Sequence, residues 1–121
     1  MKLGFVGLGK MGGNMVERLL QFGHEVVVYN RSRGPVDRLV EKGAIPSDSL
    51  ADMVSKLEGR KIVWLMVPSG QTVDDNITQL LDLMGENDIV IDGGNSNYKD
   101  TKARSERAAE RKISYLDCGT S

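Results

Sequence analysis

A glycine-rich turn near the amino terminus constrains the fold of this chain most strongly. Gly7, Gly9 and Gly12 follow a short apolar run and stand at G-x-G-x-x-G spacing before a segment of helical periodicity. The first glycine permits a sharp turn, the second lets a phosphate approach the backbone, and the third lets helix and strand pack closely. A helix that begins at Lys10 offers free N–H groups and a partial positive charge to anions. The turn therefore predicts a nucleotide-phosphate site; the alternative is a plain tight turn between strand and helix.

The rest of the chain alternates between apolar runs of strand length and segments of helical periodicity. Strands are expected at 2–6, 25–29, 44–45, 61–67, 88–91 and 113–117, and helices at 10–22, 34–42, 47–56, 73–84 and 98–111. This alternation predicts one α/β domain over residues 1–121, a Rossmann-type doubly wound, mainly parallel six-stranded sheet with helices on both faces. We expect Trp64 in its core and Cys118 buried near the end of the last strand.

Composition argues against several classes of protein. The net charge of −1 disfavours general nucleic-acid binding, which needs a large positive field. No apolar run approaches the roughly 20 residues of a membrane span, and the amino terminus has no signal-peptide pattern. The single cysteine cannot form an internal disulfide, which favours a reducing compartment. We therefore expect a cytoplasmic protein that binds neither nucleic acid nor membrane.

A second informative segment follows the strand expected at 25–29. Asn30, Arg31, Ser32 and Arg33 stand where NAD-preferring domains carry an acidic residue for the ribose hydroxyls. A guanidinium and a hydroxyl bind a 2′-phosphate, whereas a carboxylate repels it. One charge-assisted hydrogen bond contributes about 1.5–3 kcal/mol, which corresponds to roughly a tenfold to hundredfold difference in affinity. The segment predicts NADP as the cofactor; the alternative for either arginine is a solvated surface charge.

Two further segments follow expected strands at the edge of the sheet where open α/β domains bind ligands. Pro68-Ser69-Gly70 follows the strand at 61–67, and DGGNSNYKDT occupies residues 92–101. The second segment is dense in side chains that form hydrogen bonds, which predicts contacts to a ligand, although asparagine and glycine also occur in plain turns.

Together these segments resemble the amino-terminal cofactor domain of the decarboxylating 6-phosphogluconate dehydrogenases, and the resemblance runs the whole length of the chain. The GLGKMG turn is shared by the wider β-hydroxyacid dehydrogenase superfamily. The stretch IDGGNSNYKDT is far more specific, because the related 3-hydroxyisobutyrate dehydrogenases carry a loop of different character there, typically with Ser-Thr.

The resemblance implies roles for individual residues. Those expected to bind the cofactor are Gly7, Leu8, Gly9, Lys10, Met11, Gly12, Asn30, Arg31, Ser32, Val67, Pro68, Ser69 and Asn95. Asn95 is also expected to meet the substrate, and Ser121 to begin the family's substrate-binding serine-glycine-glycine motif. The arginine segment favours NADP, whereas the GLGKMG turn resembles a bacterial branch in which NAD is frequent, so NAD is the alternative cofactor. No catalytic residue and no metal site is expected within the chain.

The activity that the resemblance implies is oxidative decarboxylation of 6-phosphogluconate to ribulose 5-phosphate, in the pentose phosphate pathway, by a full-length homo-oligomer. The family's general-base lysine, its proton-donating glutamate and its helical carboxy-terminal domain would lie beyond Ser121. Residues 1–121 are therefore expected to bind cofactor without turnover. Two alternatives are a domain of a 3-hydroxyacid dehydrogenase of the 3-hydroxyisobutyrate type and a non-catalytic nucleotide-sensing module.

Overall fold

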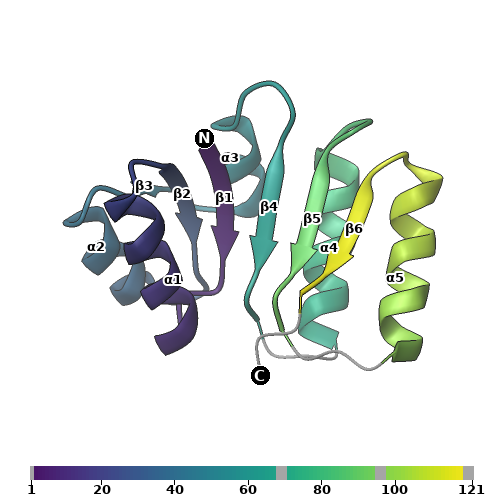
Figure 1. The fold of residues 1–121 in the computed structure, drawn as a ribbon, viewed down its shortest axis with the longest axis horizontal. Coiled ribbons are helices and arrows are strands. Elements are labelled where there is room, and N and C mark those ends of the chain that lie inside the picture. Colours follow the sequence, from purple (N-terminus) through teal and green to yellow (C-terminus); the bar gives the residue numbers. More distant parts are fainter. Residues whose placement is uncertain (1, 68–70, 95–97, 119–121) are drawn as a thin grey trace.

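The computed structural model describes residues 2–67, 71–94 and 98–118 (Figure 1). Strands and helices alternate along the chain as predicted. The strands are β1 (Lys2–Val6), β2 (Glu25–Tyr29), β3 (Ile45–Pro46), β4 (Ile62–Leu65), β5 (Ile89–Asp92) and β6 (Ser114–Asp117). The helices are α1 (Lys10–Gln21), α2 (Arg33–Val40), α3 (Leu50–Ser55), α4 (Gln71–Leu83) and α5 (Tyr98–Glu110).

The strands form one six-stranded sheet in the order β3-β2-β1-β4-β5-β6, and every neighbouring pair is parallel. The chain runs outward from β1 to β3 in one direction and from β4 to β6 in the other. The order therefore reverses between β1 and β4, which confirms the predicted doubly wound α/β fold. All strand arrows point to the same edge of the sheet in Figure 1, so the carboxyl ends of the strands share that edge.

Two apolar layers enclose the sheet. On one face, α1 and α2 pack on β1 and β2 through a cluster that includes Phe5, Val16 and Val36. On the other face, α3, α4 and α5 pack on the sheet through a larger cluster that includes Met53 and Ile77. The unbroken valine run of β2 is buried because both of its faces are covered.

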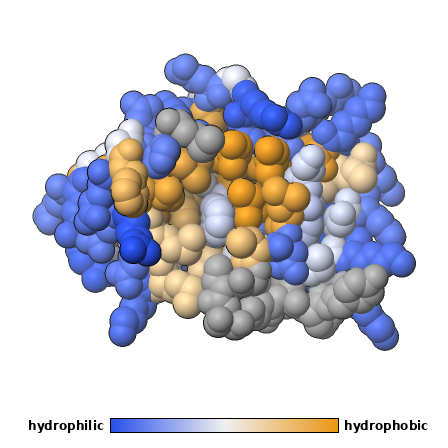
Figure 2. All heavy atoms as spheres, viewed as in Figure 1, coloured by the Kyte–Doolittle hydropathy of each residue, from blue (hydrophilic) through white to orange (hydrophobic). Residues whose placement is uncertain are grey.

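The α1 face of the sheet is not covered over its whole width. Beside α1, mainly apolar side chains of α1, β4 and β5 line an open hollow of about 710 Å³ on this face of the sheet (Figure 2). Trp64 lies here and is half-buried, and its ring stacks on that of Phe5 at a centroid distance of 6.3 Å. It therefore packs at the edge of this core cluster and not in its centre.

Cys118 is exposed, and the prediction that it is buried is wrong. It directly follows β6, which is the last strand at one margin of the sheet. Leu116 on that strand is itself 51% exposed. No described helix or strand covers this edge of the sheet well enough to bury Cys118. The backbone of Cys118 is nevertheless fixed, because its N–H donates to the carbonyl oxygen of Asp92 at 2.8 Å.

Element boundaries shift by a few residues where side chains cap helices. The helix expected from residue 47 begins at Leu50, because the Ser49 hydroxyl accepts a hydrogen bond from the Asp52 N–H and so caps the helix. Ser47 is used differently and donates to the carbonyl oxygen of Val28. None of the helices in the described ranges is long and apolar enough to span a bilayer.

Candidate functional site

The glycine turn has the geometry that its spacing predicts. Gly7 has a φ of +95°, and a Cβ there would collide with the carbonyl oxygen of Met66. A Cβ at Gly12 would collide with the carbonyl oxygen of Gly7, so this glycine permits the close contact between α1 and β1. Gly9 differs, because a Cβ there would meet no atom within 4 Å. The missing side chain at Gly9 therefore leaves open space beside the backbone, as a bound phosphate requires.

The amino terminus of α1 faces the same space. Gly9 is its N-cap and no side chain caps the helix there. The first turn carries no acidic residue. Helix N–H groups without side-chain partners, together with the helix dipole, favour an anion at this point. The residues of the turn therefore fit the pyrophosphate of a dinucleotide.

Asn30 joins the glycine turn to the segment after β2. Its Oδ1 accepts a hydrogen bond from the Leu8 N–H at 2.8 Å, and its Nδ2 donates to the carbonyl oxygen of Ser32 at 3.0 Å. Arg31 is exposed between these two anchors, and no ion pair to it occurs among the described residues. Ser32 is exposed at the N-cap of α2, and its side chain does not cap that helix. Both side chains are thus available to a ligand.

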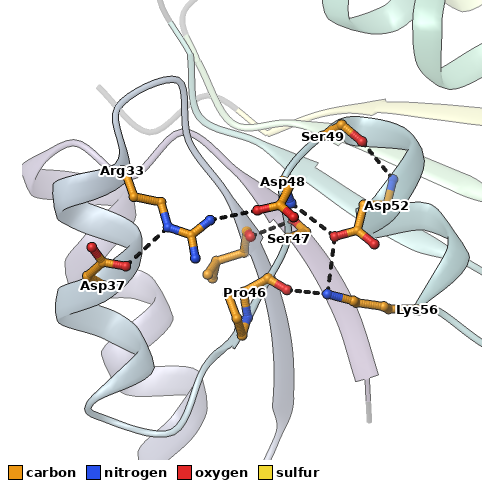
Figure 3. Close-up of polar contacts among 9 residues, drawn as sticks. Arg33, Asp37, Pro46, Ser47, Asp48, Ser49, Asp52 and Lys56 are labelled. Atoms are coloured by element: carbon orange, nitrogen blue, oxygen red, sulfur yellow. Dashed lines mark hydrogen bonds and ion pairs between the residues drawn. The ribbon is translucent and has the colours of Figure 1, made fainter.

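Arg33 is paired within the protein (Figure 3). Its Nε lies 3.1 Å from Asp37 Oδ1 and its Nη1 lies 2.8 Å from Asp48 Oδ1. Both carboxylates raise the pKa of its guanidinium, chiefly through these hydrogen bonds. Arg33 is therefore not simply a solvated charge, because it links α2 to Asp48, which precedes α3. Within α3, Asp52 forms a further ion pair with Lys56, the C-cap residue of that helix (Figure 3).

A groove of about 850 Å³ runs along the carboxyl edge at the switch point. The predicted residues that line it come from the glycine turn, the end of β2 and the end of β4. They are Gly7, Leu8, Gly9, Asn30, Arg31 and Val67. The structure thus brings together three segments that are far apart in the sequence.

The other predicted residues lie elsewhere or outside the described ranges. Lys10 lines a separate hollow of about 400 Å³ between α1 and α2, and Met11 is 49% exposed on the first turn of α1. Gly12 is buried beneath the turn. Pro68, Ser69, Asn95 and Ser121 lie outside the residues that the structure describes.

Sequence reasoning missed one wall of the groove. Polar side chains of α4 line it opposite the glycine turn, namely Thr72, Asp75, Asn76 and Gln79. Together they make this wall of the groove polar. Their spacing of three and four residues places them on one face of the helix, and this pattern was available in the sequence. That this face points to the glycine turn became visible only with the sheet order.

The comparison with protein families decides the assignment. Residues 2–121 match the family model described as the NAD binding domain of 6-phosphogluconate dehydrogenase. This chain belongs to the 6-phosphogluconate dehydrogenase family. The resemblance inferred from the sequence is therefore confirmed, and the chain is an NAD(P)-binding domain of that family of oxidoreductases.

Curated relatives agree with this assignment. An NAD(+)-dependent, decarboxylating 6-phosphogluconate dehydrogenase of Haloferax volcanii is 44% identical over 121 residues, which are 100% of this chain and 40% of the relative. A decarboxylating 6-phosphogluconate dehydrogenase of Haemophilus influenzae is 41% identical over 124 residues, covering 98% of this chain and 26% of the relative. The chain thus spans well under half the length of these relatives.

Solved structures show the same fold. Plasmodium falciparum 6-phosphogluconate dehydrogenase, solved in its apo form and in complex with NADP+ and with 6-phosphogluconate, superimposes with a TM-score of 0.87 at 27% identity. That match covers 95% of this chain and 26% of the Plasmodium chain. A 3-hydroxyisobutyrate dehydrogenase of Mycobacterium tuberculosis gives a TM-score of 0.90 at 23% identity, over 99% of this chain and 40% of the other, which shows the shared fold alone.

Proposed function

We propose that this chain binds NADP in the groove at the carboxyl edge, with NAD as the alternative cofactor. The observation that carries the proposal is the continuity of the groove from the open space at Gly9 to the exposed Arg31. The pyrophosphate would lie on the amino terminus of α1, and the adenosine ribose would lie beside Arg31 and Ser32. The polar face of α4 would form the far wall of the adenosine pocket.

The preference for NADP rests on residues of this chain. Arg31 and Ser32 both face solvent and are available for a 2′-phosphate, and no carboxylate follows β2 at Asn30. Relatives' names do not decide the point, since the Haloferax volcanii protein is named as NAD(+)-dependent and the Plasmodium falciparum structure was solved with NADP+. Asp75, on the opposite wall of the groove, carries a negative charge that is unfavourable for a 2′-phosphate.

For the longer protein we propose oxidative decarboxylation of 6-phosphogluconate to ribulose 5-phosphate, in a homo-oligomer. The cofactor would supply the hydride acceptor. The residues described here would bind it and orient it. Family resemblance assigns the general-base lysine and the proton-donating glutamate to a part of the enzyme outside this match, so we infer that residues 1–121 have no turnover by themselves. Asn95 and Ser121 would contact substrate when that part is present.

Isothermal titration calorimetry of the chain with NADP+ and with NAD+ tests the proposal. We expect tighter binding of NADP+, and we expect Arg31→Ala to reduce its affinity roughly tenfold to a hundredfold while affinity for NAD+ changes little. Arg33→Ala is the matched control, because its guanidinium is paired with Asp37 and Asp48. Equal affinities that do not respond to Arg31→Ala would show that the chain is on the NAD-using side of the family.

A further inference from the structure

Two buried carboxylates stand at opposite ends of β5. Asp88 directly precedes the strand, and its two oxygens accept hydrogen bonds from the N–H groups of Lys61 and Gly85, each at 2.8 Å. Asp92 is the last residue of the strand and has no exposed surface. Burying a carboxylate is costly unless it is hydrogen-bonded. Each carboxylate therefore holds a particular piece of the structure, one at the amino edge of the sheet and one at the carboxyl edge.

Partners of the Asp92 side chain among the described residues come from β6, from α5 and from the backbone just after β5. Its Oδ2 accepts a hydrogen bond from the Tyr115 hydroxyl on β6 at 2.6 Å, and its Oδ1 accepts one from the Gly94 N–H at 3.0 Å. The guanidinium of Arg104 lies 3.8 Å from Oδ2. Burial, together with the hydrogen bond to Asp92, raises the pKa of the Tyr115 phenol above its ordinary value, so the hydroxyl stays protonated and remains a donor.

Arg104 extends this cluster to two helices. It belongs to α5, is only 1% exposed, and donates from its Nε to Asp74 Oδ1 at 2.8 Å. Asp74 lies in the first turn of α4, the helix that forms the far wall of the groove. The cluster therefore fixes the end of β5 relative to β6, α4 and α5.

The main chain after β5 is held against the end of β4. The Gly93 N–H donates to the carbonyl oxygen of Leu65 at 2.8 Å. A Cβ at Gly94 would lie only 3.1 Å from the carbonyl oxygen of Val67, so this glycine also lies close to that segment. Val67 lines the groove. The Asp92–Gly94 hydrogen bond thus sets a stretch of backbone directly beside the groove residue at the end of β4.

This backbone lies where the second half of a dinucleotide would be. A dinucleotide in this fold crosses the sheet at the point where the strand order reverses, which here lies between β1 and β4. The adenosine ribose is proposed beside Arg31 at the end of β2, and the pyrophosphate at Gly9. The remaining nicotinamide half would then extend past Val67 toward β5, in the direction of Gly94, which lies close to the Val67 carbonyl oxygen.

We propose that Asp92 is a positioning residue for the nicotinamide half of the cofactor, acting through its hydrogen bond to the Gly94 N–H. Asp92 does not touch the cofactor, because its side chain is fully covered by protein. The inference rests on the proposed function, since it needs a dinucleotide in the groove. It assigns a role in cofactor placement to a buried cluster that shares no sequence motif. Its members, Asp74, Asp92, Arg104 and Tyr115, are scattered over residues 74–115.

The test compares two ligands that differ only in the nicotinamide ring. Affinities of the 121-residue chain are measured for NADP+ and for 2′-phospho-ADP-ribose, and their ratio gives the contribution of the nicotinamide. We expect Asp92→Ala to lower this ratio about fivefold. Asp88→Ala is the matched control, because it removes a buried carboxylate that holds backbone at the other end of β5, and it should leave the ratio unchanged. A purely structural role for Asp92 would lower both affinities together and leave the ratio unchanged, which would overturn the proposal.

A second measurement does not depend on the variants folding. In amide NMR spectra of the wild-type chain, NADP+ should shift the Gly94 resonance, and 2′-phospho-ADP-ribose should leave it in place. A Gly94 amide that responds equally to both ligands, or to neither while both bind, would overturn the inference and leave the proposed cofactor site intact. Failure of the wild-type chain to bind either ligand would instead contradict the proposed function itself, and the inference with it.

Discussion

The backbone nitrogen of Leu8 lies 2.8 Å from the side-chain oxygen of Asn30 and donates its hydrogen to it. The amide nitrogen of the same side chain donates to the carbonyl oxygen of Ser32 at 3.0 Å. One carboxamide therefore connects the turn proposed to hold the pyrophosphate with the corner proposed to hold the 2′-phosphate. Both the oxygen and the nitrogen of this carboxamide form hydrogen bonds within the protein. We therefore expect Asn30 to affect the cofactor mainly through the backbone that it orients.

Substitution of Asn30 should affect affinity for both cofactors. Asn30→Ala removes both hydrogen bonds, so it should lower the unfolding free energy by about 1 kcal/mol. It should also reduce the affinities for NADP+ and NAD+ by similar factors. Asn30→Asp keeps an acceptor for the Leu8 N–H but adds a negative charge beside Arg31. It should therefore reduce the affinity for NADP+ more than the affinity for NAD+. Calorimetric titration of the two variants measures both effects. If Asn30→Asp reduced the affinities for NADP+ and NAD+ equally, the result would contradict a 2′-phosphate site beside Arg31.

The third glycine of the turn should be essential for packing. Gly12→Ala places a Cβ against the carbonyl oxygen of Gly7 and the ring of Phe5, so we expect a loss of about 1–3 kcal/mol in unfolding free energy, measured by urea denaturation. Gly13→Ala is the control. Its Cβ would meet only the carbonyl oxygen of Leu8 at 3.8 Å, and alanine favours a helix interior by up to about 1 kcal/mol over glycine. Gly12→Ala as stable as wild type would refute the close contact of α1 and β1.

Acid should weaken the link between α4 and α5. The Arg104 hydrogen bond lowers the pKa of Asp74, with partial burial acting against it. Because the folded-state pKa is lowered, the stability that this pair contributes is fully present above the unfolded-state pKa of about 4 and is lost as the pH falls below it. Asp74→Asn should therefore reduce the difference in unfolding free energy between pH 7 and about pH 3.

A variant on the same helix serves as the control for the pH experiment. Asp82→Asn removes an exposed ion pair to Arg111, and exposed pairs contribute little to stability. It should leave the dependence of unfolding free energy on pH close to that of the wild type. If Asp74→Asn and Asp82→Asn gave the same profile, the Asp74–Arg104 pair would have no special part in acid stability.

Local sequence patterns predicted most of the fold. The valine run of β2 gave its bounds, Glu25–Tyr29, to the residue, because an apolar run between polar ends has few other interpretations in an α/β chain. Helix boundaries were less well predicted where a polar side chain has more than one possible hydrogen-bond partner. Ser49 caps α3, whereas Ser47, two residues earlier, bonds to Val28 on another strand, and propensity does not distinguish the two serines.

The site was predictable where its chemistry is local. The glycine spacing and the exposed arginine after β2 were both readable from the sequence. Contacts between distant segments were not. The sequence leaves two alternatives for Arg33, a 2′-phosphate or solvent, and its pairing with Asp48, 15 residues away, is visible only in the structure. The contact of Asp92 with Tyr115 spans 23 residues and depends on the order of the strands.

Gly9→Ala is the variant that tests the central claim most directly. The added Cβ meets no protein atom within 4 Å, so the variant should fold, at a cost of at most about 1 kcal/mol for alanine at an N-cap. Gly34→Ala, where a Cβ also meets nothing within 4 Å but which does not line the groove, is the control. If the groove holds a dinucleotide with its pyrophosphate at Gly9, Gly9→Ala should reduce affinity for NADP+ and NAD+ at least about tenfold in calorimetric titrations, and Gly34→Ala should not. Unchanged affinity of a folded Gly9→Ala chain would contradict the account.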